Sequence, residues 1–293
     1  MAAASTDRQE NRSLAWCAER LLVPGNPLTL TRPYAAENLR DPLLALRAVI
    51  GEIARVPGEV SDGDVGRRKL GWWRQALTEH LPHPALQALT ATGAARPRIV
   101  AELLGLVDAV ETTLDAPRFE TVDAFDAHAR ALAGPAARAE AGLVEDDELR
   151  QDVVESLVAL TAGAYRVRMV RDLVLDARQQ RWTVPLELQA EFQVTRQQVA
   201  AGEQPHRTRA LMAWMAGQAV TTMVRAEASL AAQAAWRHRH AVLHATLDAR
   251  LGRRIVRRPG RALEHRLDAV GPLAALTLWR RARALRRRAD RAD

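Results

Sequence analysis

Apolar side chains recur every three or four residues along most of this chain, and this spacing is the feature that most constrains its fold. In the stretch PLLALRAVIGEIARV at 42–56, one helix face would carry Leu43, Leu46, Val49, Ile50 and Ile53. The same spacing returns at residues 97–115, 121–143 and 146–178. Ala and Leu abound while runs of β-branched residues are short, so helix is favoured throughout. The sequence therefore predicts an all-α protein.

The length of 293 residues suits one large helical domain, and no linker divides the chain. Residues 1–12 are small and polar, so we expect them to form a disordered lead before a domain at 13–290. The single cysteine, Cys17, excludes an internal disulfide, which fits a reducing compartment. Because it shares an apolar helix stripe with Leu14 and Leu21, we expect a buried, inert thiol rather than a nucleophile.

The formal net charge of +7 favours an anionic partner. Nucleic acid is not expected, since no helix-turn-helix, zinc or aromatic-stacking signature accompanies the arginines. Residues 271–288 interleave leucines and Trp279 with arginines, a pattern typical of a helix lying on an anionic membrane surface. A packed terminal helix with a solvated basic end is the alternative. With no signal peptide and no apolar run of about 18 residues, we expect a cytoplasmic protein, peripheral on the inner membrane.

Two aspartates give the stretch 163–185 its specialised character. Asp172 and Asp176 are four residues apart on an expected helix, so both carboxylates project from one face. Mg²⁺ is commonly held by one or two carboxylates together with the oxygens of a substrate phosphate. Guanidinium groups that suit phosphate oxygens stand nearby, on Arg171, Arg178 and Arg181. The alternative is a salt-bridge cluster on the helix face, without metal, in which Arg168 and Arg178 neutralise the two aspartates.

This stretch resembles the second aspartate motif of squalene and phytoene synthases, RDxxxDxRxGRxYLP. The matching residues are Arg171-Asp172, Asp176-Ala177-Arg178, Arg181 and Pro185. Two further stretches resemble helices of the same family, namely 42–56 and RFETVDAFDAHARALAG at 118–134. The resemblance implies the isoprenoid synthase fold, a single helical domain around a central cavity. It also implies that Asp172 and Asp176 bind Mg²⁺ and that Arg171, Arg178 and Arg181 bind a diphosphate.

The first aspartate motif of that family has no counterpart here. The family's first carboxylate cluster falls on the helix at 42–56, where this chain has Ala54, Arg55 and Gly58. The asparagine that precedes the second motif is replaced by Arg168, four residues before Asp172, which supplies positive charge where a metal would. Ionisation of a prenyl diphosphate depends on metal clusters that neutralise the leaving group. We therefore expect a degenerate active site without catalytic residues, that is, a pseudoenzyme.

The resemblance is closest to a divergent subgroup of the family. GRRKLGWWRQAL at 66–77 and EIARV at 52–56 are similar to segments of the mitochondrial complex I assembly factor and its bacterial relatives. This implies a non-catalytic assembly protein, or one that binds a lipid or isoprenoid, with a respiratory-complex client as partner. The alternative is a divergent Mg²⁺-dependent prenyltransferase that acts on isoprenyl diphosphates in isoprenoid, carotenoid or hopanoid biosynthesis.

Three histidines at 238, 240 and 244 also have helical spacing. His240 and His244 are four residues apart and could share a metal ion. However, no third ligand is evident nearby, and Arg237 and Arg239 would repel a cation. We therefore do not expect zinc at this position.

Overall fold

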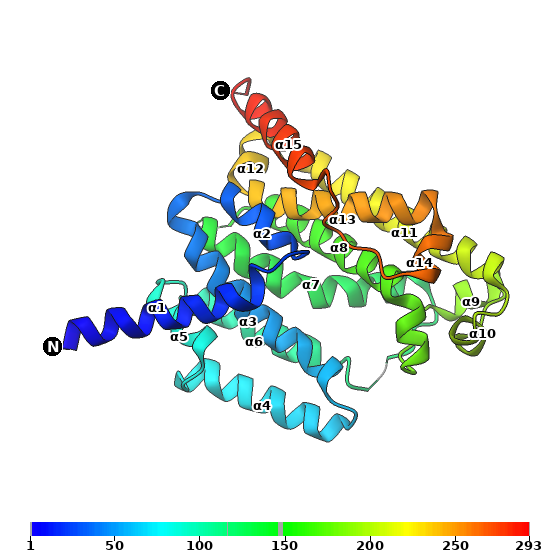
Figure 1. Cartoon of the computed structure of the whole chain (residues 1–293), viewed down its shortest axis with the longest axis horizontal. Coiled ribbons are helices and arrows are strands. Elements are labelled where there is room, and N and C mark those ends of the chain that lie inside the picture. The colour runs from blue at the N-terminus through cyan, green and yellow to red at the C-terminus, as the bar shows by residue number, and fades with distance from the viewer. Residues whose placement is uncertain (1, 116, 146–148, 293) are drawn as a thin grey trace.

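The structure is a computed structural model that describes residues 2–115, 117–145 and 149–292, with side chains from Asn11 onward. All regular elements in these ranges are helical, which confirms the predicted all-α class (Figure 1). The helices are α1 (Ala2–Leu21), α2 (Pro27–Thr31), α3 (Arg40–Glu59), α4 (Gly63–Glu79), α5 (Pro84–Ala91), α6 (Pro97–Glu111), α7 (Val122–Val144), α8 (Gln151–Arg178), α9 (Leu186–Phe192), α10 (Arg196–Ala201), α11 (Pro205–Ser229), α12 (Ala232–Arg237), α13 (Arg239–Arg257), α14 (Pro259–Glu264) and α15 (Ala274–Ala289).

Helix α8 lies at the centre and packs against α7, α11 and α13. It is apolar on several sides, and its buried residues include Val153, Leu157, Val167 and Val170. A Cβ at Gly163 would lie 2.3 Å from Cγ of Met223 on α11, so these two helices can approach this closely only because residue 163 has no side chain. The end of α8 that carries the aspartates is thereby held against the rest of the bundle.

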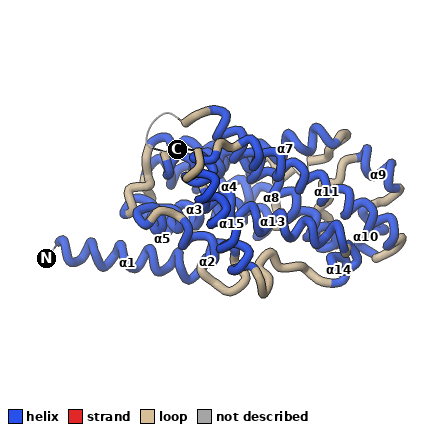
Figure 2. Tube along the Cα trace, turned by 90° about the horizontal axis from the view of Figure 1, so that it is seen from above, coloured by secondary structure: helices blue, strands red, loops and turns tan. Residues whose placement is uncertain are grey.

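Two hydrophobic cores lie on either side of α7 and α8. One core contains residues of α1, of the helices from α3 through α6 and of the inner face of α7. The other contains residues of α8, α11, α13 and α15. Figure 1 shows the first group in blue and cyan and the second in yellow to red, with the green helices between them. In Figure 2, α1 projects from one end of the molecule, while α9 and α10 lie at the opposite end.

The boundaries of several elements differ from the predictions. The backbone of α1 is helical from Ala2, so the helix reaches back through the expected lead 1–12, of which Met1 lies outside the described residues. Helix α3 continues through Pro57 to Glu59, because a proline in the last turn removes only one backbone hydrogen bond. Between α1 and α3 lies the short helix α2, which Asn26 caps by accepting a hydrogen bond from the backbone N–H of Leu28 at 3.0 Å.

Helix α8 was expected to begin at residue 146 and begins at Gln151, while residues 146–148 lie outside the described residues. Thr195 caps α10, since its hydroxyl accepts a hydrogen bond from the backbone N–H of Gln198 and forms a capping box with this residue. Among the described residues, no helix has the length and hydrophobicity required to cross a membrane.

Candidate diphosphate site

Asp172 lies near the end of α8 and is held by two arginines. Arg171 Nε donates to its Oδ1 at 2.9 Å, and Arg266 Nε donates to the same oxygen at 2.8 Å. The Nη2 atoms of Arg171 and Arg266 donate to Oδ2 at 2.5 and 3.2 Å. Burial alone would raise the pKa of Asp172, but the four bonds outweigh it and hold the pKa below its usual value. Asp172 is therefore an ionised carboxylate with both oxygens in use.

Asp176, one turn further along α8, has a single guanidinium partner. Arg181 Nη2 donates to Asp176 Oδ1 at 3.0 Å and Arg181 Nε to the same atom at 3.2 Å. The chain turns back between these residues at Gln180, whose φ of 60° lies in the left-handed region. Burial raises the pKa of Asp176 and Arg181 opposes this only in part.

The remaining arginines of the predicted cluster bind elsewhere, which corrects the salt-bridge alternative. Arg168 Nη1 donates to Asp248 Oδ2 on α13 at 2.8 Å, and Arg178 Nε donates to the backbone oxygen of Ala200 at 3.3 Å. The partners of Asp172 and Asp176 are instead Arg171, Arg181 and the distant Arg266. Sequence spacing could not identify Asp248 or Arg266, because both reach α8 from elements far along the chain.

The first-motif positions lie beside the second motif. A Cβ at Gly58 would be 3.9 Å from Arg181 Nη1, so the end of α3 faces the end of α8. Ala54 and Arg55 are exposed, and Arg55 Nη2 donates to Glu52 Oε1 of the same helix at 2.5 Å. These three positions therefore contribute no carboxylate opposite Asp172 and Asp176.

A cluster of buried and half-buried charged and polar side chains occupies the space between α3, α7, α8 and α13. We call it the central polar cluster, and its members are Arg47, Glu140, Arg168, His240, His244 and Asp248. Arg47 Nη2 donates to Glu140 Oε2 at 2.8 Å, and His240 Nε2 lies 3.8 Å from the same carboxylate oxygen. His244 Nδ1 lies 3.5 Å from Thr31 Oγ1. The sequence analysis missed Arg47, Glu140 and Asp248, because each is an isolated charge within an apolar helix face.

Burial dominates the ionisation of the central polar cluster. It raises the pKa of Glu140 and of Asp248, although Arg47 and Arg168 respectively oppose the shift. It lowers the pKa of His240 to about 3, with help from His238, Arg47 and Arg239, and lowers that of His244 well below its usual value. Both imidazoles are therefore neutral at pH 7, next to guanidinium groups that disfavour a second cation.

Two hollows of several hundred Å³ lie outside this centre. A groove of about 400 Å³ between α1, α4, α5 and α6 is largely apolar, with Leu77, Leu81, Leu86, Leu89 and Val100 in its lining. A second hollow of about 430 Å³ between α8, α11, α13 and α15 has Leu160, Met223, Arg253 and Arg288 in its lining. The apolar groove has the volume and lining of a small-molecule pocket.

Cys17 is fully buried, as predicted, and burial raises the pKa of its thiol to about 11. His238 lies within 3.0 Å of a carboxylate oxygen of Glu145. His238 therefore lies next to Glu145, whereas His240 lies next to Glu140. No group of three or more potential metal-binding side chains is found in the described part of the chain.

The residues at the end of α8 fit a metal only incompletely. Asp176 Oδ2 has no hydrogen-bond partner among the described residues, so it could bind Mg²⁺. Both oxygens of Asp172 are occupied, and release of Arg266 would be needed before this carboxylate joined the same ion. Four guanidinium groups, on Arg171, Arg178, Arg181 and Arg266, lie in this region and could contact the phosphate groups of a ligand.

Comparisons with known proteins agree with the all-helical fold. Among solved structures, a dehydrosqualene synthase crystallised with a ligand matches with a TM-score of 0.75 and 14% identity, over 96% of this chain and 99% of that one. Squalene synthase HpnC from Alicyclobacillus acidocaldarius matches with a TM-score of 0.64 and 17% identity, over 86% of this chain and 95% of that one. A search of curated protein sequences finds no significant match. Residues 26–280 match the model of the family described as squalene/phytoene synthase, so the chain belongs to the squalene/phytoene synthase family.

Proposed function

We propose that this protein is a non-catalytic member of its family. The observation that carries the proposal is the pairing of Asp172 with both Arg171 and Arg266, opposite an α3 end without carboxylates at Ala54, Arg55 and Gly58. Ionisation of a prenyl diphosphate requires several positive charges close to the leaving oxygens, and metal ions normally provide them. Here one carboxylate cluster is missing and the other is neutralised internally.

The test is an assay of the purified chain with farnesyl or geranylgeranyl diphosphate and Mg²⁺, beside an authentic dehydrosqualene synthase as positive control. We expect no release of diphosphate and no C30 or C40 product. Turnover that Asp172→Ala abolishes would overturn the proposal.

A divergent prenyltransferase is the second candidate, and the retained pair Asp172 and Asp176 favours it. The free Oδ2 of Asp176 and the surrounding arginines could hold one Mg²⁺–diphosphate group after Arg266 moves away. This candidate predicts Mg²⁺-dependent binding of inorganic diphosphate that Asp176→Asn weakens. If Asp176→Asn leaves diphosphate binding unchanged, the second candidate fails even before turnover is measured.

For the non-catalytic protein we propose a lipid or isoprenoid as ligand, bound in the apolar groove between α1, α4, α5 and α6. The groove combines leucine side chains with polar groups on Ser13, His80 and Thr90, as an amphiphile requires. Native mass spectrometry of protein purified without detergent should show a bound mass. Thr90→Trp, which fills the groove from its exposed rim, should remove the bound mass, whereas Thr221→Trp on the exposed part of α11 should not.

We propose a respiratory complex as the client of an assembly role, which the subgroup resemblance of the segments at 52–56 and 66–77 supports. In a bacterium that carries this gene, deletion should lower NADH:quinone oxidoreductase activity. Because the proposed role is non-catalytic, a gene that encodes Asp172→Ala should restore the activity as well as the unmodified gene. If only the unmodified gene restores the NADH:quinone oxidoreductase activity, the divergent prenyltransferase is favoured instead.

We further propose that α15 docks on an anionic membrane surface. Its exposed side carries Leu273, Leu276 and Trp279, which are 59%, 42% and 48% exposed. Arg283 stacks on Trp279 with Cζ 4.8 Å from the ring centroid, and Arg280 and Arg287 are also exposed. Apolar side chains among arginines suit an anionic interface, where each basic residue contributes roughly 1 kcal/mol.

Vesicle co-sedimentation can test this docking, but deletion of α15 would uncover Leu278 and Leu285, which are buried against the bundle. Point variants on the exposed side are therefore the better choice. We expect binding to phosphatidylglycerol vesicles at low salt, loss in Leu276→Ser/Trp279→Ser, and little binding to phosphatidylcholine. Equal binding by the variant and the unmodified chain would contradict docking through α15.

A further inference from the structure

A small pocket at the junction of α13 and α14 is lined by four arginines. Its lining consists of Arg254, Arg257, Arg258, Arg261 and Leu267, and its volume is about 200 Å³. The lining contains no carboxylate. We propose that this four-arginine pocket binds a phosphoryl anion, either inorganic phosphate or diphosphate or the phosphomonoester headgroup of a lipid.

The chain bends where the arginines converge. Residues 254, 257, 258 and 261 have the spacing of one helix face, so an unbroken helix would carry them in a row. Pro259 disfavours helical conformation in the residue before it, and Arg258 accordingly has φ −143° and ψ 64°. The break turns α14 relative to α13 and brings the four guanidinium groups around one concave space instead of along a line.

These arginines lack the carboxylate partners that many other arginines of this protein have. In the described part of the chain, no side-chain ion pair or side-chain hydrogen bond is found for Arg257, Arg258 or Arg261, while Arg254 Nη1 donates to the backbone oxygen of Asp268 at 2.8 Å. By contrast, Arg74 bonds both Asp108 and Glu111, and Arg67 bonds Asp64. The pocket therefore concentrates positive charge that the protein itself leaves uncompensated.

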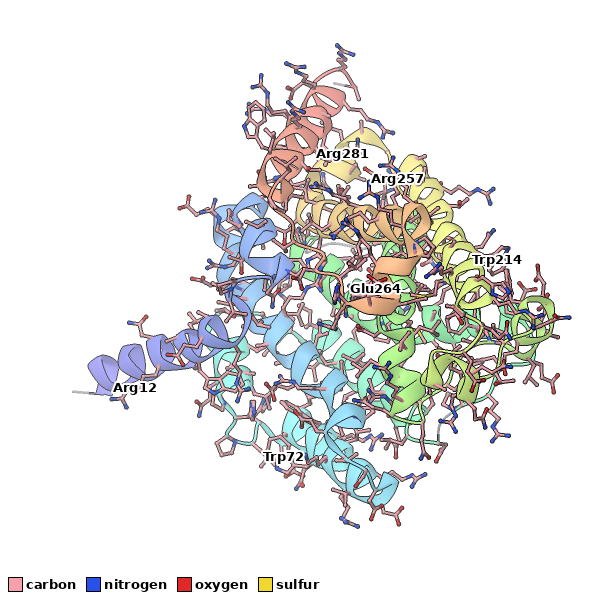
Figure 3. The ribbon with its side chains drawn as sticks, turned by 45° about the vertical axis from the view of Figure 1, so that its right-hand side comes forward. Arg12, Trp72, Trp214, Arg257, Glu264 and Arg281 are labelled. Atoms are coloured by element: carbon pink, nitrogen blue, oxygen red, sulfur yellow. The ribbon has the colours of Figure 1, made fainter. Side chains whose placement is uncertain are left out.

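Nearby acidic groups do not face into the pocket. Glu264 lies at the other end of α14 (Figure 3). It lines a separate hollow together with Arg178. Asp268 contributes only its backbone oxygen to Arg254. Arg266, which precedes the lining residue Leu267, points to Asp172. The four-arginine pocket is thus distinct from the carboxylate pair at the end of α8.

A structural role at the end of α13 accounts for only part of this charge. The negative end of a helix dipole corresponds to roughly half an elementary charge and favours one cation in the last turn. Arg254, through its bond to the chain at Asp268, can serve in that role. The other three guanidinium groups exceed what the helix end can neutralise. A phosphoryl group, with several acceptor oxygens and up to two charges, matches their forked donors.

The arginines of α15 differ from those of the pocket in their surroundings. Figure 3 labels Arg257 at the end of α13 and Arg281 on α15, and Arg281 is paired with Glu227. Arg281 and Arg288 line the second hollow, whose lining includes the carboxylate of Glu227, whereas Arg280 and Arg287 are exposed and line neither this hollow nor the four-arginine pocket. Substitution of two arginines in the pocket, and separately of two arginines on α15, therefore distinguishes binding in a specific pocket from attraction by the overall positive charge.

The experiment is isothermal titration of the full chain with inorganic phosphate and with inorganic diphosphate, in EDTA so that the Asp172 and Asp176 pair cannot contribute through Mg²⁺. The pocket variant is Arg257→Gln/Arg261→Gln, and the matched control is Arg280→Gln/Arg287→Gln, which removes the same charge. We expect saturable binding of diphosphate that weakens about tenfold or more in the pocket variant and less than about twofold in the control. Thermal unfolding should be the same for all three proteins, since the substituted side chains are exposed.

Water-soluble dihexanoyl phosphatidic acid, titrated under the same conditions, distinguishes the two sources of the anion. Binding of the short-chain lipid tenfold tighter than phosphate would assign the pocket to a lipid headgroup, and tighter binding of diphosphate would assign it to a free anion. The proposal is overturned if none of the three probes binds, or if the control variant loses as much affinity as the pocket variant. The latter result would mean that overall charge alone attracts the anions.

Discussion

Two carboxylate–guanidinium pairs in this molecule, Glu140 with Arg47 and Asp172 with Arg266, have similar bond lengths and differ in exposure. The Glu140 and Arg47 side chains are 7% and 23% exposed and belong to the central polar cluster. The Asp172 and Arg266 side chains are 19% and 59% exposed, and Arg266 approaches from the segment that follows α14. A buried pair cannot exchange its partner for water, whereas an exposed guanidinium can leave at little cost. The ion pair of Glu140 and Arg47 is therefore a fixed part of the structure, whereas the ion pair of Asp172 and Arg266 can open.

The comparison also bears on function. The central polar cluster fills the space between α3, α7, α8 and α13 with fixed charges, while the end of α8 keeps carboxylates whose partners can be displaced. The end of α8 is therefore the place where displacement of a guanidinium group by a metal ion can be tested. Three measurements test this distinction.

The largest effect is expected from Glu140→Ala. This change leaves the Arg47 guanidinium without its carboxylate in a buried setting, and loss of one partner of a buried pair typically lowers the free energy of unfolding by about 3–5 kcal/mol. Urea denaturation followed by circular dichroism measures this loss in the free energy of unfolding. Arg47→Met/Glu140→Leu, which removes both charges, should recover most of the loss. A loss below about 1 kcal/mol in the single variant would mean that water reaches the pair.

An intermediate effect is expected from acidification. The pKa of His240 is about 3 in the folded protein and ordinarily near 6.5, so between these values the unfolded chain binds a proton that the folded chain does not. Stability due to this residue is therefore present above about pH 6.5 and lost as the pH falls towards 3, by roughly 1.4 kcal/mol per pH unit. Glu140 and Asp248, whose pKa values are raised, act in the opposite direction.

Comparison with His240→Gln isolates the imidazole from these carboxylates. Denaturation midpoints of both proteins at pH 7, 6 and 5 should diverge at pH 7 and converge as the pH falls, because only the unmodified chain loses the contribution of His240. Parallel curves would show that His240 accepts a proton in the folded state as readily as in the unfolded state.

The smallest effect on stability is expected from Arg266→Gln. Since this arginine is exposed, its loss should change the free energy of unfolding by less than about 1 kcal/mol. The pKa of Asp172 should rise towards its usual value, because two of its four hydrogen bonds are removed.

Arg266→Gln should also free Asp172 for a metal ion, which sharpens the contrast with the buried pair. Thermal unfolding with Mg²⁺ and inorganic diphosphate should show a larger stabilisation of this variant than of the unmodified chain. Arg280→Gln, on the exposed side of α15, is the control for loss of one positive charge. No difference between the two variants would show that Arg266 does not restrict access to Asp172.

The amino-acid sequence by itself determined the helical class and the helices that carry or face the candidate site. Helical spacing of apolar residues predicted α3, α6, α7 and α8, because each must bury one face to be stable. The starts of α5 and α10 are also set locally, since His83 and Thr195 accept hydrogen bonds from backbone groups only two or three residues away. The family motif likewise located Asp172 and Asp176 on one helix face.

Only the tertiary structure decided how the charges pair. The salt-bridge alternative paired Arg168 and Arg178 with the two aspartates, yet Arg168 bonds Asp248 and Asp172 is bonded by Arg266. Neighbours along a helix are fixed by its 3.6-residue repeat, so they can be predicted from spacing alone. Partners that come from another helix depend on how the helices pack, and the energy of each pair depends on the burial that packing creates. For the same reason the central polar cluster and the four-arginine pocket could not be predicted from spacing, because both depend on how α13 and α14 pack in the fold.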